Sequence, residues 1–382
     1  MFYLDSLKLQ CFRNYQGQRV KFHPRLNLLV GNNGQGKSNL LEAIFFLSVN
    51  RSFRTVRDYE LVNYNHDSFQ LEGIFSKDDL LDTVKVKYNR SRPLTITLNN
   101  NPAKRYDYLQ KYPVVVFSPD DLMLISAGPS ERRRFLNLEA SRLSAPYFKA
   151  LKAYQRVLIQ RNHLLKEKKY DRFLNDYLTT WNEALLDLGS RIIKYRFDLV
   201  RELEEEAFSF YNSMTAGKEK LSFSYYSTVF DRYCDDIDCW EDIRCSFEQQ
   251  LKEKFYLEKQ RAVTLVGPHL DDLQIFVDSK EARRYSSQGQ KRTAALAMKM
   301  AEISLFEKKY GEAPIILLDD VFSEFDLERG KHLFKLLSTS RAQCLITTAV
   351  ELTELAASFQ SDFKVIKIFQ GSANDETGRN CC

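Results

Sequence analysis

A complete phosphate-binding loop of the form G-x-x-x-x-G-K-S occupies residues 31–38. Its glycines allow backbone N–H groups to surround phosphate oxygens, and the N-terminus of the helix that follows adds positive potential. In such a loop Lys37 reaches the β- and γ-phosphates, while the Ser38 hydroxyl ligates Mg²⁺. Apolar sequence before the loop and a helical pattern after it supply the strand–loop–helix context that the motif requires. The residues predicted to contact the nucleotide here are Gly31, Asn32, Asn33, Gly34, Gln35, Gly36, Lys37, Ser38 and Asn39.

Two carboxylates follow an apolar stretch in the C-terminal part of the chain. Residues 314–318 predict a buried strand, and Asp319 and Asp320 come directly after it. A parallel strand delivers the residues at its carboxyl end to the crevice where phosphates bind. We therefore assign Asp319 to Mg²⁺ through a water molecule, and Asp320 to orienting or deprotonating the attacking water. Ser38 and Asp319 form the predicted metal set, and Asp320 joins Lys37 as a predicted catalytic residue.

A third candidate is the turn Ser-Ser-Gln-Gly-Gln at residues 286–290, which precedes a helical pattern at residues 293–307. Such a turn at a helix N-terminus presents a hydroxyl, N–H groups and the helix dipole to an anion. Turns of this composition also cap many helices that bind no ligand. The turn alone therefore does not indicate a ligand site, and it becomes informative only together with the phosphate loop and the Asp319–Asp320 pair.

The elements that must position these motifs change along the chain. Residues 2–118 contain alternating apolar and polar positions, which predicts strands, with one helix after the phosphate loop. From about Ile125 the period becomes helical, and two long amphipathic helices are expected to join near residues 168–176. Strand-like sequence returns at 221–226, 263–266 and 273–277, around a helix at 240–259. The predicted fold class is α/β (α+β) with mixed sheets, divided into 1–125 (head, N-terminal part), 126–261 (helical lobe), 262–370 (head, C-terminal part) and 371–382 (disordered tail).

The composition indicates a globular protein. Of the 382 residues 44% are hydrophobic, and no apolar run reaches the length of a membrane span. The first residues include Asp5 in place of a basic stretch and show no small-residue cleavage site, so we expect a cytoplasmic protein. Seven cysteines form no paired C-x-x-C pattern, and those at 234, 239 and 245 have no neighbouring histidine, which favours free thiols over a zinc site.

The net charge of +5 hides a polarity along the chain. Between Glu131 and Arg172, twelve Lys and Arg residues stand against four acids, a local charge of +8, and the remainder sums to −3. A concentrated basic segment on a near-neutral body is typical of a surface that binds phosphate backbones. A solvated helix face gives the same pattern, so both interpretations stay open.

The order of the motifs resembles that of ABC-type ATPases. The phosphate loop, residues 286–290, the Asp319–Asp320 pair and residues 323–326 correspond to Walker A, signature, Walker B and D-loop. Three features depart from the common pattern. The signature differs from L-S-G-G-Q, and Asp320 stands where these ATPases usually have a catalytic glutamate. No switch histidine follows residues 346–348. These departures argue against a transporter subunit and favour the DNA-repair branch.

Within that branch the chain resembles the RecF recombination-mediator family over nearly its full length. Leu270 stands where that family commonly has arginine after Gly-Pro-His. The matching motifs, in chain order, lie at residues 12–15, 31–38, 52–55, 117–122, 128–129, 132–133, 135–136, 267–269, 287–290, 292–295 and 319–321.

This resemblance implies an ABC/SMC-like head with a helical second lobe inserted between the head halves. It also implies weak ATP hydrolysis with Mg²⁺, ATP-dependent dimerisation on DNA, and work with RecO and RecR to load RecA at gapped or damaged DNA during recombinational repair and the SOS response. Ser287 becomes the signature serine, with a catalytic role, and Gln290 is grouped with the nucleotide-binding residues. Arg13 is a candidate nucleotide contact, and a plain ion-pair or packing role for it stays open.

A homodimer follows from the ABC arrangement. A signature serine has no phosphate to contact within its own chain's site, so it faces the nucleotide of a partner and two ATP molecules lie between two chains. DNA, both duplex and gapped or single-strand junctions, is the other expected partner, and no membrane is expected. An SMC-type chromosome or break-repair ATPase is the first alternative, but it would need hundreds of residues of heptad repeats between its head halves, and the helical lobe here is far too short. An ABC transporter motor is the second alternative, but it would need a better match to L-S-G-G-Q and a switch histidine, and this chain has neither.

Overall fold

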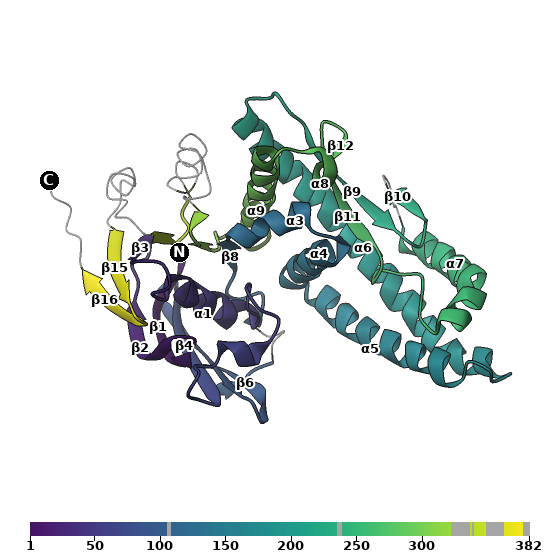
Figure 1. The fold of residues 1–382 in the computed structure, drawn as a ribbon, viewed down its shortest axis with the longest axis horizontal. Coiled ribbons are helices and arrows are strands. Elements are labelled where there is room, and N and C mark those ends of the chain that lie inside the picture. The colour runs from purple at the N-terminus through teal and green to yellow at the C-terminus, as the bar shows by residue number, and fades with distance from the viewer. Residues whose placement is uncertain (105–107, 235–238, 322–336, 338–339, 349–362, 377–382) are drawn as a thin grey trace. The chain divides into compact units, whose positions relative to one another are not determined.

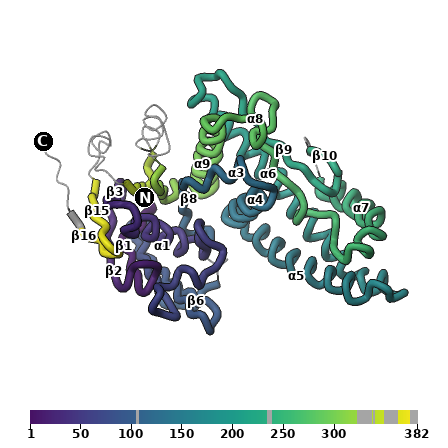
Figure 2. The backbone as a smooth tube through the Cα atoms, in the orientation of Figure 1, coloured from purple at the N-terminus to yellow at the C-terminus, as the bar shows by residue number. Residues whose placement is uncertain are grey.

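The computed structural model describes residues 1–104, 108–234, 239–321, 337, 340–348 and 363–376. The chain divides into two compact units (Figures 1 and 2). Unit 1 consists of Met1–Asp121 with Glu302–Cys382, and unit 2 consists of Leu122–Ala301. Helix α9 (Gln288–Tyr310) carries the chain from unit 2 back into unit 1.

The first sheet of unit 1 is antiparallel and is built from consecutive N-terminal strands in the order β2-β1-β4-β5-β6-β7. Side chains of β4 alternate between buried and partly exposed positions, as expected of a sheet with one covered face. The strands expected in this part of the chain are therefore confirmed. Their bounds are β1 (Phe2–Phe12), β2 (Tyr15–Lys21), β4 (Ser68–Lys77), β5 (Leu80–Asn89), β6 (Arg92–Leu98) and β7 (Asn101–Pro102).

The second sheet of unit 1 has the order β16-β15-β3-β14-β13-β8, and its five strands from β15 to β8 are parallel. Every residue of β3, β8, β13 and β14 is buried, as expected of parallel strands that are covered on both faces. Their sequences are apolar apart from Asn27 in β3 and Thr347 and Thr348 in β14. Helix α1 (Lys37–Val49) contacts strands of both sheets, and most of its residues are buried. The strand bounds are β3 (Leu26–Val30), β8 (Val114–Phe117), β13 (Ile315–Leu318), β14 (Cys344–Thr348), β15 (Phe363–Phe369) and β16 (Ser372–Glu376).

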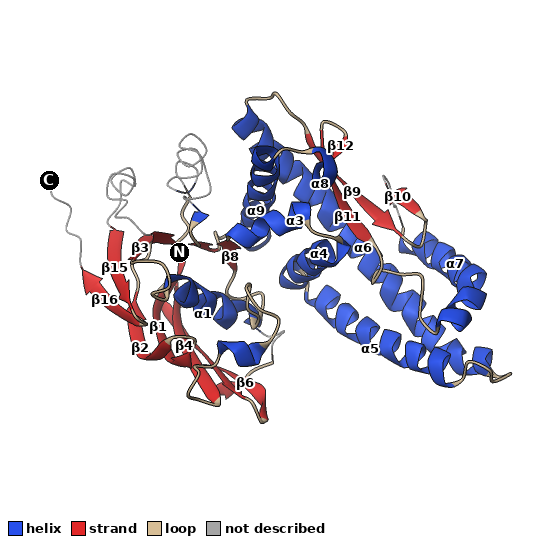
Figure 3. Ribbon diagram, in the orientation of Figure 1, coloured by secondary structure: helices blue, strands red, loops and turns tan. Residues whose placement is uncertain are grey.

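Unit 2 is mainly helical (Figure 3) and also contains the antiparallel sheet β10-β9-β11-β12. The two long amphipathic helices expected from the sequence are α5 and the 42-residue α6, and they pack against each other. The helices are α3 (Met123–Ser126), α4 (Pro129–Leu143), α5 (Ala145–Glu167), α6 (Leu174–Thr215), α7 (Trp240–Arg261) and α8 (Ala282–Tyr285). The strands are β9 (Leu221–Ser227), β10 (Arg232–Cys234), β11 (Asp272–Val277) and β12 (Lys280–Glu281).

The strand expected at residues 263–266 is wrong, because side chains rather than a neighbouring strand satisfy this backbone. The N–H of Thr264 donates to Asn162 Oδ1 at 2.8 Å, and the N–H of Leu265 donates to Glu258 Oε1 at 2.8 Å. With its hydrogen bonds supplied by these side chains, the segment forms an irregular loop.

Two predicted boundaries also differ from the structure. The head was expected to resume at residue 262, but β11 pairs with β9 along six positions, so residues 262–301 belong to unit 2. The tail at 371–382 was expected to be disordered, whereas β16 pairs with β15 through a tight turn in which Gln370 and Gly371 both have positive φ. Residues 377–382 and the D-loop at 323–326 lie outside the described residues.

Candidate nucleotide site

The phosphate loop connects β3 to α1, and glycine geometry determines its shape. Gly34 and Gly36 have φ of 81° and 117°, values that a side chain disfavours. A Cβ on Gly36 would also lie 2.7 Å from Asn14 Nδ2. Gly36 is the N-cap of α1 and offers no side-chain cap, so backbone N–H groups in the first turn are left for another acceptor. The loop therefore has the architecture of an anion site.

Lys37 is held against the carbonyl oxygens of its own loop. Its Nζ donates to Gly31 O and to Asn32 O, the latter at 3.0 Å, and the residue is only 8% exposed. Burial lowers the pKa of Lys37, and the neighbouring carboxylates of Asp320 and Asp319 partly oppose this shift. A cation held in this way requires little rearrangement to meet an incoming phosphate.

Asp319 meets Ser38 at the carboxyl end of β13. The Ser38 hydroxyl donates to Asp319 Oδ1 at 2.7 Å, and Thr347 Oγ1 donates to the same oxygen at 3.1 Å. Burial raises the pKa of Asp319, while the hydrogen bonds from Ser38 and Thr347 oppose that rise. The predicted metal pair is therefore adjacent in space.

These two oxygen donors fit Mg²⁺. The ion is usually bound by one or two protein groups, with waters and substrate phosphates completing its octahedron. A buried carboxylate with a raised pKa is also stabilised in its charged form by a cation. Among the residues that the structure describes, no group of three or more His, Cys, Asp or Glu side chains could hold a metal. A site for Mg²⁺ would thus depend on Ser38, Asp319 and the phosphates themselves.

Asp320 follows directly and has a strained backbone. Its φ is 53°, and its N–H donates to Thr347 Oγ1 at 2.8 Å. The residue is exposed, in contrast to buried Asp319. Thr347, at the end of β14, thus contacts both aspartates. In the sequence, Thr347 was noted only as part of residues 346–348, which no switch histidine follows.

Two turns hold the phosphate loop from outside. Asn14 Nδ2 donates to Gln35 O at 2.9 Å, and the N–H of Gly371 donates to the same oxygen at 3.0 Å. The N–H of Gln370 donates to Gln35 Oε1 at 2.7 Å, and the Tyr15 hydroxyl donates to Gly36 O at 3.0 Å. The turn at 370–371 was not predicted, because nothing in its composition distinguishes it from a tail.

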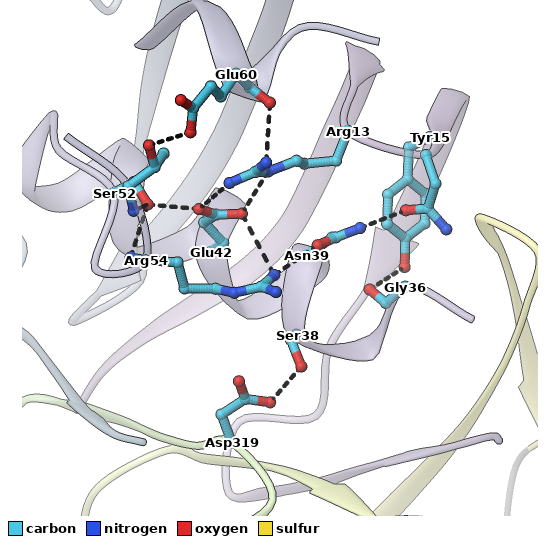
Figure 4. Close-up of polar contacts among 12 residues, drawn as sticks. Arg13, Tyr15, Gly36, Ser38, Asn39, Glu42, Ser52, Arg54, Glu60 and Asp319 are labelled. Atoms are coloured by element: carbon cyan, nitrogen blue, oxygen red, sulfur yellow. Dashed lines mark hydrogen bonds and ion pairs between the residues drawn. The ribbon is translucent and has the colours of Figure 1, made fainter. Parts of the chain in front are cut away.

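A buried carboxylate, Glu42, organises the arginines beside the loop (Figure 4). Arg13 donates to both oxygens of Glu42, at 2.8 and 2.9 Å, and its third guanidinium nitrogen donates to Glu60 O. The structure therefore places Arg13 in an ion pair. An ion-pair role was the alternative to a nucleotide contact that the sequence left open for this residue. Ser52 Oγ also donates to Glu42 Oε1.

Arg54 is a neighbouring cation that the site prediction missed. Its NH1 donates to Asn39 Oδ1 at 2.8 Å and lies 3.8 Å from Glu42 Oε2. The side chain is 41% exposed, and its charge acts to lower the pKa of Asp319. The motif at residues 52–55 was noted in the sequence, but no spacing rule connected Arg54 with the loop.

Ser287 and Gln290 belong to unit 2, where they form a reciprocal cap at the start of α9. The N–H of Gln290 donates to Ser287 Oγ at 3.2 Å, and the N–H of Ser287 donates to Gln290 Oε1 at 2.8 Å. Gln290 Nε2 donates in addition to Glu219 at 2.9 Å. Ser287 is exposed, so the turn presents its hydroxyl at a helix N-terminus as expected.

The fold and this site define an ABC-type ATPase head. The family model described as RecF/RecN/SMC N terminal domain matches residues 3–371. The chain is 37% identical to the DNA replication and repair protein RecF of Alkaliphilus oremlandii, with 91% of this chain and 93% of the relative covered. Identity to the protein of the same name from Ligilactobacillus salivarius is also 37%, over 98% of both chains. The chain belongs to the RecF family.

Solved structures agree with this family. The recombination mediator protein RecF with ATP, described as part of the RecFOR pathway, is similar with a TM-score of 0.90 and 34% identity over 98% of both chains. An Smc head domain from Pyrococcus furiosus shares the fold, with a TM-score of 0.55 and 17% identity over 98% of this chain and 96% of the other. The family and the fold class predicted from the motifs are thus confirmed. In the described part of the chain, no helix is both long and apolar enough to span a membrane.

Proposed function

We propose that this chain binds ATP with Mg²⁺ at the phosphate loop and hydrolyses ATP slowly. The observation that carries this proposal is the 2.7 Å contact between Ser38 and Asp319 beside the buried ammonium of Lys37. A RecF relative with 34% identity has been solved with ATP, which supports the choice of nucleotide. The packed loop and its glycine geometry match what phosphate binding requires.

Each side chain of the site has a distinct role in the proposal. Lys37 binds phosphate oxygens as a point charge, and Ser38 and Asp319 are the residues that would hold Mg²⁺, Asp319 through a water molecule. Bound Mg²⁺ supplies positive charge where negative charge develops on the phosphates. Asp320 orients the attacking water or accepts its proton. Thr347 helps to position both residues, because its hydroxyl donates to the Asp319 carboxylate and accepts from the backbone N–H of Asp320.

We further propose that ATP joins two copies of the chain on DNA. Ser287 and Gln290 of each copy would then face the nucleotide of its partner, which gives their exposed turn a ligand. The dimer would bind duplex DNA and gapped or single-strand junctions, and would help RecO and RecR to load RecA at gaps or damaged forks. The relatives' names, which refer to DNA replication and repair and to the RecFOR pathway, support this role.

Light scattering of the full chain with and without Mg²⁺–ATP and a gapped duplex tests the proposal. The wild-type mass should double with ATP, and Lys37→Met should stay monomeric because a phosphate contact is lost. Lys87→Met, a change at an exposed position of β5, is the matched control and should behave as wild type. Unchanged ATP affinity in Lys37→Met would refute the assigned site.

A further inference from the structure

The structure divides the basic segment between Glu131 and Arg172 into two classes of cation. The first class is used internally: Arg132 forms a two-pronged pair with Asp272, at 2.9 and 2.7 Å, and fully buried Arg161 pairs with Glu258. These arginines stabilise unit 2 and are not available to a ligand. The charge that remains on the surface forms two groups: Lys149, Lys152 and Arg156 are exposed along α5, and Lys166, Lys168 and Arg172 are exposed toward the C-terminal end of the segment. The second group lies among exposed aromatic side chains.

We call the connection between α5 and α6, together with the last turns of α7, the basic tip, comprising residues 166–177 and 254–261. Figures 1 and 2 show the connection at the end of the α5–α6 hairpin. Lys169 Nζ donates to Gln260 O at 2.8 Å, which ties the connection to α7. Beneath it Leu165, Leu174 and Leu178 form a small core with partly buried Phe255 against it. The tip is therefore a packed platform rather than a loose loop.

Aromatic rings alternate with these cations on the tip. Tyr170 is 90% exposed and Tyr256 is 69% exposed, while Phe173 and Tyr177 are about half-exposed. Lys169 lies 5.7 Å from the ring centre of Tyr170, and Arg172 lies 4.5 Å from that of Phe173. Such cation–π contacts hold both partners at the surface without burying the rings. Exposed rings beside positive charge form the combination that proteins use to bind single strands.

We propose that the basic tip binds single-stranded DNA, with unstacked bases on Tyr170 and Phe173 and phosphates on Lys166, Lys168 and Arg172. This inference rests on the proposed DNA-repair function and assigns the single-stranded side of a gap to this surface. Duplex DNA would use only the charges, because its base faces are stacked and covered. An acidic protein surface would also meet the charges, but it offers no planar faces to match four exposed rings.

The test compares Tyr170→Ala/Phe173→Ala with the matched control Tyr64→Ala, a fully exposed ring in unit 1. Fluorescence anisotropy of the full chain with a thymine oligonucleotide and with a duplex of equal length gives both affinities. Single-strand affinity should fall by roughly five-fold or more for each ring removed, while duplex affinity and ATP binding stay unchanged. The double variant Lys168→Ala/Arg172→Ala should instead weaken the salt dependence: the negative slope of log affinity against log salt should become shallower by roughly 0.7 per lost phosphate contact.

Every outcome decides between the possibilities. If wild-type protein binds no DNA, the proposed function fails; if it binds DNA but the ring variant binds single strands as well as wild type, the tip proposal fails alone. Equal losses on both DNA forms would also overturn it, as would intact DNA binding with lost binding of RecR or RecO. Should the double variant misfold, Tyr170→Trp provides a second readout, since a base stacked on the new indole must quench its fluorescence.

Discussion

The Ser38 hydroxyl and the Asp319 carboxylate lie 2.7 Å apart although 281 positions separate them in the chain. The parallel sheet explains this proximity, because β3 and β13 both pair with β14 and all three present their carboxyl ends at one edge. Thr347, at that end of β14, contacts Asp319 and the backbone of Asp320. The middle strand therefore completes a site whose other two parts were recognisable from sequence.

Asp320→Asn should retain ATP but lose hydrolysis. The substitution removes the carboxylate assigned to the attacking water, whereas Asp319 still faces Ser38. We expect turnover to fall by about 10²-fold or more, a typical effect of removing a general base, and the ATP-bound dimer to persist. Phosphate release and light scattering measure the two effects. Normal turnover would show that Asp320 is a structural acid, and Asp67→Asn, at an exposed position of unit 1, serves as a control.

Ser287→Arg should bind ATP as a monomer and fail to dimerise. The exposed serine hydroxyl caps α9, and a bulky cation there would intrude where the partner's nucleotide is proposed to lie. Mixed with Lys37→Met, the variant offers one composite site with an intact loop and an intact signature. Sedimentation of each variant alone and of the mixture checks this, and strong ATP-dependent dimerisation of Ser287→Arg alone contradicts the sandwich arrangement.

Gly371→Ala should disturb the phosphate loop, while Gly311→Ala should affect only local backbone strain. Both glycines have positive φ, at 73° and 72°, but a Cβ on Gly371 would lie 2.3 Å from Asn14 O, whereas one on Gly311 meets nothing within 4 Å. The Gly311 variant should lose about 1 kcal/mol of stability. The Gly371 variant should lose more and should bind ATP more weakly, because the hydrogen bonds of its turn to Gln35 are displaced. Thermal unfolding and nucleotide titration distinguish the two, and equal behaviour would rule out the support role of the turn.

Unit 2 should become less stable as the pH falls from about 6.5 toward 4. Burial, together with Arg133, Arg196 and Arg161, lowers the pKa of His269 to about 4, below its ordinary value of 6.5. The unfolded chain therefore binds a proton that the folded chain excludes, and stability rises with pH across this window. We expect a loss of about 1–2 kcal/mol between pH 7 and pH 5 from this residue.

His269→Gln should flatten that pH dependence, because glutamine does not titrate in this range. The amide oxygen can still accept from the Tyr154 hydroxyl, which lies 2.8 Å from His269 Nδ1, so the fold should be kept. His163→Gln, at an exposed position of α5, should leave the dependence as in wild type. Chemical unfolding at both pH values measures the difference. A His269→Gln profile parallel to that of wild type would assign the acid sensitivity to other groups.

Sequence reasoning identified those elements whose signals are local. The phosphate loop, the acidic strand end and the period of α5 and α6 can each be read from a short window. The loop at 263–266 could not, because Asn162 and Glu258 replace the strand partner that its apolar residues suggested. Arg54 and the turn at Gln370 were missed for the same reason: each reaches the site through a contact between distant segments.

The position of β3 between β14 and β15 has a consequence for how the protein is made. β3 is synthesised early, but both of its neighbours lie after residue 343, so this sheet cannot close until almost the whole chain has left the ribosome. Unit 2, in contrast, is one continuous stretch and can fold while the last strands are still being translated. The apolar β3, with all five residues buried in the finished protein, must wait without its partners. A ribosome stalled before β14 should therefore display a chain that cannot retain ATP, and truncation there should yield a protein that depends on chaperones.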